Sequence, residues 1–525
     1  MTSVGQALIA GLRARGVEVV FGIPGVHTVE LYRGLAGSGI RHVTARHEQG
    51  AAFMADGYAR VSGKPGVALV ITGPGLTNAL TAMAQARADS VPILVISGVN
   101  RRDSLGKGYG LLHELPDQSG LIAALCPTQQ VSTAADLGPV LDWAFATMAA
   151  GRPGPVHVQI PTDVMPLPCM DLPKPADVPA RALPDAGLVA EAAELLNSAG
   201  RVVILAGGGA LRAGGALRAL AKRLDAPVVQ TVNGRGIMAG DAALSVPASP
   251  SLGAVRALIL GADRVLAIGT ELGQTDYDMN LAGGMVDLGS MIRVDVCEDQ
   301  LERHRAAVAI CADAGDAIAA LMPLLAQKGG DGAARAEVVR VAARGELAGV
   351  NPVMPQQLTM VEAIRDAVPG VIIVGDSTQP VYAGNLYYEP GREVGWFNAA
   401  TGFGALGYGP GAAVGAALAA PGVPVVCLIG DGGLQFSPGE LRTAVDEGLP
   451  ISFVVWNNAG FREIAEGMAA VGAQVIGCDP SPLKMAPFAQ ACDLPFVSVA
   501  NDPSALRAAL LDGTKGPRLI EVRVS

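Results

Sequence analysis

The sequence has little charge and few aromatic residues. Of its 525 residues, 16% are charged and 4% are aromatic, whereas half are hydrophobic. A chain this apolar is not disordered, and its length is enough for about three or four ordinary domains. The scarcity of aromatics, together with 68 glycines and 36 prolines, disfavours an all-β sandwich and favours α/β layers with small apolar side chains.

Excess positive charge, cysteine pairs and a leader segment are also lacking. The 38 basic and 48 acidic side chains leave a net charge of −10, so no basic stripe is available to neutralise nucleic-acid phosphates. The seven cysteines are odd in number and lack CxxC spacing, which fits a reducing compartment. The first residues show no basic segment followed by an apolar core, so we expect a cytoplasmic protein rather than an exported one.

One long stretch has no charged side chain at all. It runs between Glu393 and Asp431, and by its length it is a candidate for a membrane span. Pro410, Pro421 and Pro424, with the repeated glycines around them, divide it into a loop, a short Ala-rich helix and a strand. We therefore expect buried core here and no membrane partner.

Short β-branched runs alternate with helical stretches in three parts of the chain. This alternation is typical of parallel sheets with helices on both faces. We expect an α/β protein of three doubly wound domains, at 1–165, 185–326 and 356–525. A Pro-rich segment at 166–184 and an Ala/Gly/Lys-rich tract at 327–355 are the expected linkers.

Oxygen-bearing residues follow two neighbouring strands of the third part. One strand ends in Gly430-Asp431-Gly432, and the next ends in a pair of asparagines of which Asn458 is the second. In a parallel βαβ unit both lie at carboxyl ends of strands, where such sheets bind ligands. The carboxylate of Asp431, the amide oxygen of Asn458 and the carbonyl of Gly460 are ligands that Mg²⁺ favours. An ordinary Asp-Gly turn followed by an Asn turn is the alternative explanation.

With these motifs the sequence resembles, over essentially its whole length, the thiamine diphosphate (ThDP) enzymes of the pyruvate decarboxylase, acetolactate synthase and benzoylformate decarboxylase group. The cofactor fingerprint of that group is a GDG followed by an NN. The resemblance implies that Asp431, Asn458 and Gly460 hold Mg²⁺ against the cofactor's diphosphate. It also implies decarboxylation of a 2-oxo acid through a C2 ylid and an enamine, which is then released as an aldehyde or added to a second carbonyl.

The resemblance assigns further residues to the cofactor. In these families the glutamate of the RHE segment, here Glu48, hydrogen-bonds the aminopyrimidine ring and promotes removal of the C2 proton; a desolvated carboxyl group with a raised pKa suits this role. Leu406 corresponds to the aliphatic side chain under the bent cofactor. A helix-capping or surface acid is the alternative explanation of Glu48, and a core leucine is that of Leu406. The other implied cofactor-binding residues are Pro24, Gly25, Gly73, Asn78, Thr378, Gln379, Gly404, Gly430, Gly432 and Gly433.

Four residues limit which reaction of this group of enzymes the chain is expected to catalyse. His27 stands where benzaldehyde lyase has a histidine, and His113 is near the place of a glutamine in acetolactate synthases; each suits proton transfer near neutral pH, or else helix capping or an interface. Ile464 occupies a position that is acidic in pyruvate decarboxylases, which disfavours that activity. Glu463 occupies an apolar position of related enzymes and suits a substrate with a cationic tail, unless it pairs with Arg462 or faces solvent.

The segments FGIPGVHTVELYRGL and HELPDQ look most like 5-guanidino-2-oxopentanoate decarboxylases, which act on the 2-oxo acid of arginine. An acetolactate synthase-type carboligase, joining two pyruvates, is the alternative, because the RHE segment is equally typical of it. The central part lacks the arginine of the FAD-binding segment of acetolactate synthases, which argues against FAD. Glycines 207–209 follow a strand but lack GxGxxG spacing, so an ordinary turn is favoured there over a dehydrogenase's dinucleotide site.

In the family the active site forms across a dimer, with Glu48 of one subunit facing Asp431 of the other. The resemblance therefore implies a homodimer or homotetramer that acts on a small 2-oxo acid. A non-catalytic subunit with the ThDP fold is the alternative from another class of protein. The joint presence of Glu48, Asp431 and Asn458 argues against that alternative.

Overall fold

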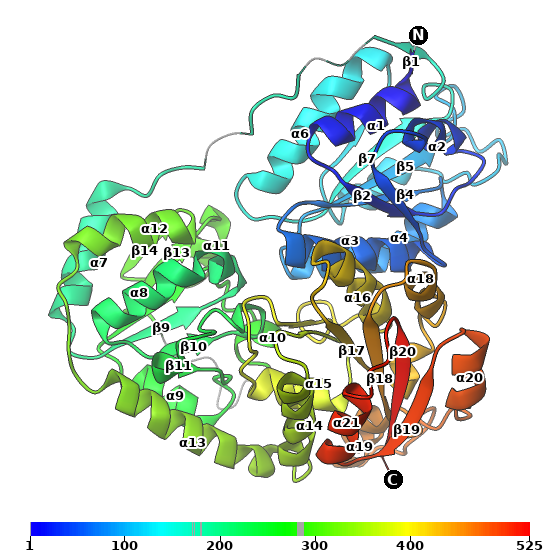
Figure 1. Cartoon of the computed structure of the whole chain (residues 1–525). Helices are drawn as coiled ribbons and strands as arrows, with labels where there is room; N and C mark the ends of the chain where they lie inside the picture. Colours follow the sequence, from blue (N-terminus) through cyan, green and yellow to red (C-terminus); the bar gives the residue numbers. More distant parts are fainter. Residues whose placement is uncertain (1, 171, 173, 179–180, 281–287, 525) are drawn as a thin grey trace.

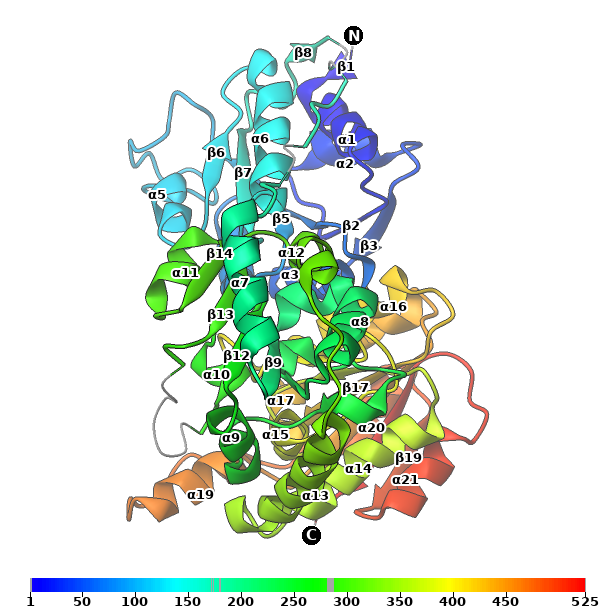
Figure 2. The ribbon, with the colours of Figure 1, turned by 90° about the vertical axis from the view of Figure 1, so that its left-hand side faces the viewer.

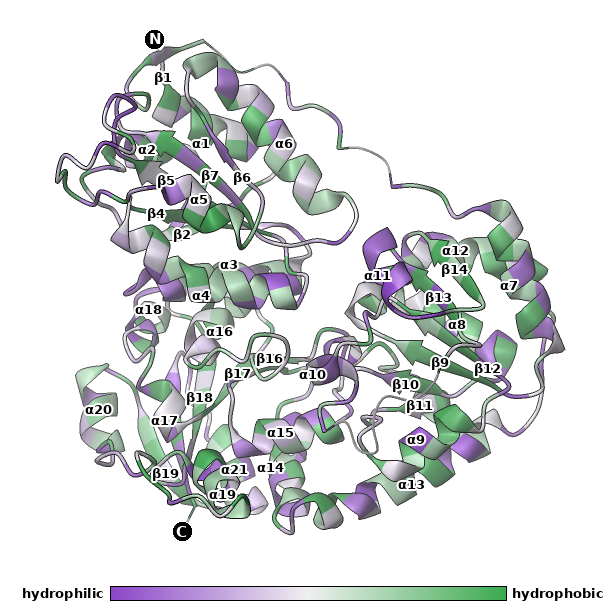
Figure 3. Cartoon of the chain, turned by 180° about the vertical axis from the view of Figure 1, so that it is seen from behind, coloured by the Kyte–Doolittle hydropathy of each residue, from purple (hydrophilic) through white to green (hydrophobic). Residues whose placement is uncertain are grey.

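Three six-stranded parallel β-sheets follow one another along the chain, each flanked by helices (Figure 1). The computed structural model describes residues 2–524 apart from 171, 173, 179–180 and 281–287. Apolar residues fill the strands of the sheets, while polar residues gather on the outer faces of the helices (Figure 3). The predicted α/β class with three parallel-sheet domains is confirmed.

The first sheet has the strand order β3-β2-β4-β5-β7-β6. A short strand, β1, precedes it and pairs antiparallel with β8, at the start of the Pro-rich segment. The strands are β1 (Thr2–Ser3), β2 (Val19–Gly22), β3 (Arg41–Thr44), β4 (Gly66–Val70), β5 (Ile93–Val99), β6 (Thr128–Gln130), β7 (Val156–Pro161) and β8 (Pro168–Cys169). The helices are α1 (Val4–Ala14), α2 (Val29–Leu35), α3 (Glu48–Ser62), α4 (Pro74–Ala88), α5 (Gln118–Ala123), the 3₁₀ turn η1 (Ala134–Asp136) and α6 (Leu137–Ala149).

The central sheet has the strand order β11-β10-β9-β12-β13-β14. Its strands are β9 (Val202–Ala206), β10 (Val228–Gln230), β11 (Ser245–Val246), β12 (Arg264–Ile268), β13 (Ile292–Asp295) and β14 (Val308–Cys311). Its helices are α7 (Ala186–Ser198), α8 (Gly214–Leu224), α9 (Gly253–Leu260), α10 (Gln274–Tyr277), α11 (Glu298–Arg303) and α12 (Ala314–Leu321), with 3₁₀ turns η2 (Gly208–Ala213), η3 (Val232–Gly234), η4 (Ala242–Leu244) and η5 (Met322–Leu324).

The third sheet has the strand order β16-β15-β17-β18-β20-β19. Its strands are β15 (Ile372–Gly375), β16 (Trp396–Asn398), β17 (Val425–Gly430), β18 (Ile451–Asn457), β19 (Phe496–Ala500) and β20 (Arg518–Arg523). Its helices are α14 (Met354–Ala367), α15 (Gln379–Leu386), α16 (Tyr408–Ala419), α17 (Asp431–Leu434), α18 (Glu440–Asp446), α19 (Arg462–Ala470), α20 (Met485–Ala491) and α21 (Pro503–Leu510).

The tract at 327–355, expected as a linker, is mostly helical. Helix α13 (Gly332–Val350) occupies it and leads directly into α14 (Figure 1). Alanine, arginine and glutamate are good helix formers, and Ala336, Ala343 and Leu347 bury one side of this helix. The connection between the central and third sheets is therefore a packed element rather than an extended one.

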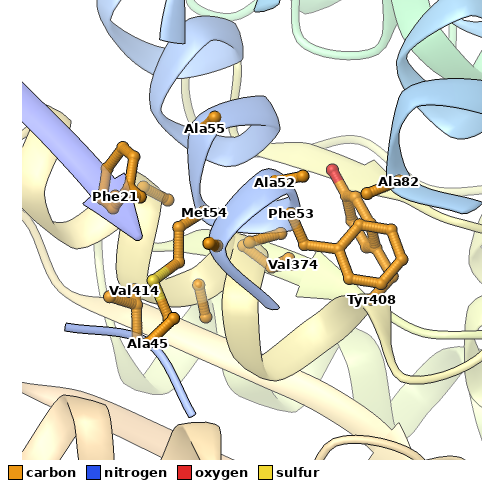
Figure 4. Close-up of a cluster of buried hydrophobic side chains, with 14 of the residues drawn as sticks. Phe21, Ala45, Ala52, Phe53, Met54, Ala55, Ala82, Val374, Tyr408 and Val414 are labelled. Atoms are coloured by element: carbon orange, nitrogen blue, oxygen red, sulfur yellow. The ribbon is translucent and has the colours of Figure 1, made fainter. Parts of the chain in front are cut away.

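Helix α16 joins the first and third domains by packing against α3 (Figure 1). The two backbones touch, because a Cβ atom built on Gly57 would lie 2.1 Å from the carbonyl oxygen of Ala412. Figure 4 shows Phe53 and Met54 of α3 packed with Tyr408 and Val414 of α16. Eleven of the helix's residues, Tyr408 to Leu418, are buried. Most of the charge-free stretch thus forms buried core, as predicted, and none of the described helices is long and apolar enough to cross a membrane.

Candidate active site

Glu48 and Asn78 meet at the carboxyl edge of the first sheet. Glu48 is the first residue of α3, and its half-buried carboxylate accepts a hydrogen bond from Asn78 of α4 (Nδ2–Oε2 2.9 Å). A Cβ atom on Gly75 would lie only 3.3 Å from Oε1 of Glu48, so the carboxylate lies over the first turn of α4. The side chain therefore lies in a defined position above the sheet edge rather than in free solvent.

Glycines bring the loops of this edge into direct contact. A Cβ atom on Gly25 would lie 2.3 Å from Cδ1 of Ile71, which follows β4, while the preceding Pro24 is exposed. Gly73 has a φ of +63°, and its Cβ would lie 2.4 Å from the carbonyl oxygen of His113. Only glycine fits at position 73, because the positive φ and the nearby carbonyl oxygen of His113 both exclude a side chain. The predicted cofactor turn and the segment of His113 are thus held together.

The two predicted histidines form a pair. The rings of His27 and His113 lie edge to face, with centroids 5.2 Å apart and an interplanar angle of 69°. Burial, and then the nearby His113, lower the pKa of His27. The Nδ1 atoms of both rings are buried and have no hydrogen-bond partner among the described residues. An imidazole with an unsatisfied ring nitrogen can accept or donate a proton.

Gln118 is a site residue that the sequence did not reveal. Its side chain is 4% exposed, and its Oε1 accepts the backbone N–H of Gly73 (3.1 Å). Its Nε2 donates to the carbonyl of Gly98 (2.9 Å), to Oε1 of Gln159 (2.9 Å) and to Oγ of Ser97 (3.2 Å). One amide therefore ties the loop after β4 to strands β5 and β7. A polar residue at the start of a short helix gives no sign of such burial.

Asp431 and Asn458 meet at the carboxyl edge of the third sheet. Asp431 is 4% exposed, and its Oδ1 accepts the backbone N–H of Asn458 (3.4 Å). One end of the Asn458 amide faces Oε1 of Gln379 (3.2 Å), and the other end faces the carbonyl of Gly460 (2.8 Å) and Oδ1 of Asp431 (3.2 Å). Burial raises the pKa of Asp431.

When the amide of Asn458 has its oxygen toward Asp431 and Gly460, three acceptor oxygens converge with no hydrogen between them. Turning the amide around would let its nitrogen donate to both neighbours, but it would then present an oxygen to Oε1 of Gln379. A divalent cation satisfies all three oxygens without that conflict, and its charge would favour the ionised form of Asp431. The residues present therefore fit Mg²⁺.

Gln379 also lies next to Glu463. The side-chain oxygen of Gln379 accepts a hydrogen bond from the indole Nε1 of Trp456 (3.4 Å). Burial and the charge of Glu466 raise the pKa of Glu463, and a hydrogen bond with Gln379 lowers it by a smaller amount. Arg462 donates to the carbonyl of Asn458 and pairs with Asp479, so the expected alternative of an Arg462–Glu463 pair is not found. Glu463 as a residue is exposed in the single chain, which agrees with the alternative of an acid that faces solvent, but its carboxyl group lies beside Gln379 and is partly desolvated.

The remaining predicted cofactor residues surround the same edge. Thr378 is 6% exposed, and its Oγ1 lies 3.1 Å from a Cβ built on Gly430. Gly432 lies against the ring of Phe461, which a Cβ would approach to 2.6 Å. Leu406 is half-buried, on the loop before α16, so it is not a fully buried core leucine. Gly404 has a φ of +75° on the same loop, Gly433 lies in α17, and Ile464 of α19 is 56% exposed.

The two halves of the site are separate within one chain. Across the described residues, no hydrogen bond or ion pair links Glu48, Asn78 or the histidine pair to Asp431, Asn458 or Gln379. Large apolar side chains are exposed beside both halves. They are Val26, Val29, Leu112, Phe403, Phe436 and Ile464. Helix α19 has no buried residue and projects from the third domain (Figure 2).

Glycines 207–209 of the central domain pack against their own sheet. The N–H of Gly207 donates to Ile268 and that of Gly209 to Gly269, both at 3.0 Å. A Cβ on Gly207 would lie 2.3 Å from the carbonyl oxygen of Gly269. These N–H groups are used internally, so they are not available to a diphosphate, and close packing is the reason for the glycines.

Comparison with known proteins identifies the family of this chain. Three family models of thiamine pyrophosphate (TPP) enzymes match this chain; thiamine pyrophosphate is another name for ThDP. The model of the N-terminal TPP-binding domain matches residues 2–121, that of the central domain 189–321 and that of the C-terminal TPP-binding domain 376–522. A probable 2-ketoarginine decarboxylase of Pseudomonas aeruginosa is 43% identical over 91% of this chain and 86% of its own length.

More distant relatives are acetolactate synthases. The large subunit of isozyme 1 of Escherichia coli is 30% identical over 99% of this chain and 93% of its own length. The large subunit of Parasynechococcus marenigrum is 31% identical over 86% of this chain and 75% of its own length. The predicted resemblance is confirmed: the chain belongs to the family of thiamine diphosphate-dependent decarboxylases and carboligases.

Proposed function

We propose that this enzyme decarboxylates a 2-oxo acid with a cationic tail, best represented by 5-guanidino-2-oxopentanoate (2-ketoarginine), with ThDP and Mg²⁺. The observation that carries the substrate class is the carboxylate of Glu463 beside Gln379, at the edge of the predicted metal site. A partly desolvated carboxylate is suited to a guanidinium group through a charge-assisted pair of hydrogen bonds. The relative that is named as a probable 2-ketoarginine decarboxylase supports the same choice.

Each predicted residue then has a task. Asp431, Asn458 and Gly460 hold Mg²⁺, while Glu48, oriented by Asn78, binds the aminopyrimidine ring. Thiamine diphosphate supplies the electron sink for the loss of CO₂. The paired rings of His27 and His113 move protons to and from the substrate, because at least His27 is held neutral by its surroundings.

We infer that the working enzyme is a homodimer, or a homotetramer of two such dimers, in the cytoplasm. Each half of the site has exposed apolar side chains beside it, and these are the surfaces that a second subunit would cover. The site would then combine Glu48 of one subunit with Asp431 of its partner.

Subunit complementation tests this arrangement. Glu48→Gln and Asp431→Asn each disable one half of the site, and a mixed dimer of the two contains one intact site. At limiting Mg²⁺ we expect each variant alone to have little activity, and activity to return when the two are unfolded and refolded together. Sites formed within single chains would give no recovery.

A CO₂-release assay across 2-oxo acids tests the substrate. We expect the wild type to prefer 2-ketoarginine to pyruvate and benzoylformate, and Glu463→Gln to lower kcat/KM for 2-ketoarginine about 10- to 100-fold, the loss typical of a charged hydrogen bond. Pyruvate turnover should be unaffected. Asp479→Asn, a nearby exposed acid that pairs with Arg462, is the matched control and should behave as the wild type. A wild type that prefers pyruvate would refute the cationic substrate.

The same assay decides between the alternatives. Acetolactate formed from two pyruvates, with yellow FAD bound to the purified protein, would identify the carboligase that the acetolactate synthase relatives represent. Release of no CO₂ from any 2-oxo acid would identify a non-catalytic subunit.

A further inference from the structure

Asp376 is a buried carboxylate to which the proposed chemistry gives no role. It follows strand β15 and is fully buried. Its Oδ2 accepts the backbone N–H of Gly409 and its Oδ1 that of Ser377, both at 2.9 Å. The backbone of Gly407 and Tyr408 contributes further hydrogen bonds. Among the described residues it has no ion pair with lysine or arginine, so backbone N–H groups are its stabilising partners.

These partners lie on the loops that carry predicted cofactor residues. Ser377 immediately precedes Thr378. Gly407 and Gly409 follow Leu406 and form the first turn of α16. A Cβ built on Gly433 would lie 3.1 Å from Oδ1 of Asp376, so the third loop lies against the same carboxylate.

The bond to Gly409 also caps a helix. The N-cap of α16 is Gly407, which has no side chain and a φ of +77°, so the helix lacks a local side-chain cap. Asp376, which lies 33 residues before Gly409, takes the place of a local N-cap side chain. Its carboxylate places a negative charge at the positive end of the helix. An ionised carboxylate is the suitable group, because it only accepts hydrogen bonds and its neighbours only donate them.

We propose that Asp376 is a positioning residue for thiamine diphosphate, whose carboxylate fixes the relative places of the loops bearing Thr378, Leu406 and Gly433. This inference depends on the proposed cofactor site. A buried charge is costly unless its surroundings satisfy it, and here the hydrogen-bond partners belong to two loops of that site, while the loop of Gly433 packs against the same carboxylate. The carboxylate therefore couples loops that no other single described side chain is seen to join.

Titration of the cofactor-free protein with ThDP at saturating Mg²⁺, by calorimetry and by quenching of tryptophan fluorescence, tests the proposal. We expect Asp376→Asn to raise the dissociation constant of ThDP about tenfold or more, since its NH₂ group cannot accept from the loops. The melting temperature of cofactor-free Asp376→Asn should not fall below that of the cofactor-free wild type. Asp276→Asn is the matched control, because Asp276 is a half-buried acid whose carboxylate also accepts a backbone N–H, from Asn233, but in the central domain.

Wild-type affinity in Asp376→Asn overturns the proposal, as does an equal loss in Asp276→Asn. Where Asp376→Asn yields no folded protein, Asp376→Glu is judged by the same titration, since it keeps the charge but displaces it by one methylene. Failure of the wild type to bind ThDP would instead refute the cofactor site itself, so the two failures are distinguishable.

Discussion

Nδ2 of Asn78 lies 2.9 Å from Oε2 of Glu48 and donates a hydrogen bond to it. Glu48 begins α3 and Asn78 lies in the second turn of α4, and these two neighbouring helices follow different strands of the first sheet. The hydrogen bond uses one oxygen of the carboxylate and leaves the other for a ligand. Asn78 thereby orients Glu48.

Replacing Glu48 by Gln should lower kcat by about 10²- to 10⁴-fold, the usual contribution of a positioned acid–base group. ThDP binding should persist, because the metal half of the site is intact. Steady-state assays and ThDP titration of the same preparation check this expectation. Glu30→Gln, which alters another glutamate of the first domain, should retain activity. Unchanged decarboxylation in Glu48→Gln would contradict the proposed mechanism.

The Asn78–Glu48 bond predicts a coupling between the two residues. Asn78→Leu alone should reduce kcat, whereas in a Glu48→Gln background it should have little further effect, because the acceptor it orients has already been changed. A double-mutant cycle on kcat measures this coupling. Fully additive losses would show that Asn78 acts independently of Glu48.

Removal of the metal should abolish ThDP binding. We expect EDTA treatment to release the cofactor and added Mg²⁺ to restore it. Asp431→Asn should raise the Mg²⁺ concentration needed for half-maximal ThDP binding at least about tenfold, since even indirect partners of metal ligands have effects of this size. Asp493→Asn, an exposed acid of the same domain, is the control. Full ThDP affinity in EDTA would exclude the metal role of these residues.

The fold was predictable because its periodicity is strong and local. Runs such as those now seen as β4, β5 and β17 are apolar and bounded by glycine or proline, and parallel sheets buried on both faces require this pattern. The tract at 327–355 was harder to interpret, since its alanines and glycines suit a linker as well as a helix. Its burial against the central domain decides in favour of helix α13.

The site was predictable where motif and strand end coincide, as for Asp431 and Asn458. Gln118, Asp376 and Glu440 could not be found in this way. Each acts on backbone groups of segments that are distant in the sequence, and no spacing along the chain encodes such contacts. Burial of a polar side chain is the property that identifies all three, and it is visible only in the folded chain.

Asp376 should contribute to the pH dependence of the free energy of unfolding. Burial raises its pKa to about 6 from 3.8, so between these values the folded state binds more protons than the unfolded state and stability falls as pH rises. Asp376→Asn lacks this contribution. From pH 4 to pH 7 its free energy of unfolding should therefore improve by about 2 kcal/mol relative to the cofactor-free wild type. Urea titrations at both pH values measure it; parallel pH profiles would contradict the buried, ionised carboxylate.

The contact of α3 with α16 predicts that Gly57→Ala destabilises the protein. The added methyl group would lie 2.1 Å from the carbonyl oxygen of Ala412, so the helices must move apart, at a cost of about 1–3 kcal/mol or more. Gly345→Ala is the control. Gly345 lies in α13 with open space around its Cβ position, and alanine there should stabilise the helix by about 0.5–1 kcal/mol. Chemical denaturation measures both; equal effects would show that the close contact is absent.

Glu440 of α18 holds the segment that leads to Glu48. Its carboxylate is 1% exposed and accepts the backbone N–H groups of Arg46 (3.1 and 3.2 Å) and His47 (3.1 Å), while Thr443 donates to it at 2.7 Å. Burial raises the pKa of Glu440. A residue of the third domain thus fixes the start of α3 in the first domain.

Glu440→Gln should therefore lower kcat several-fold while the dissociation constant of ThDP stays near the wild-type value, because the amide NH₂ cannot accept from both N–H groups and Glu48 is displaced. Glu447→Gln is the matched control, since Glu447 also bridges the two domains, through Arg41, but at an exposed place away from Glu48. Equal losses in the two variants, or a parallel loss of ThDP affinity in Glu440→Gln, would show that Glu440 only stabilises the domain contact. A selective loss of kcat would show that the packing of α3 on the third domain sets the position of the acid–base group.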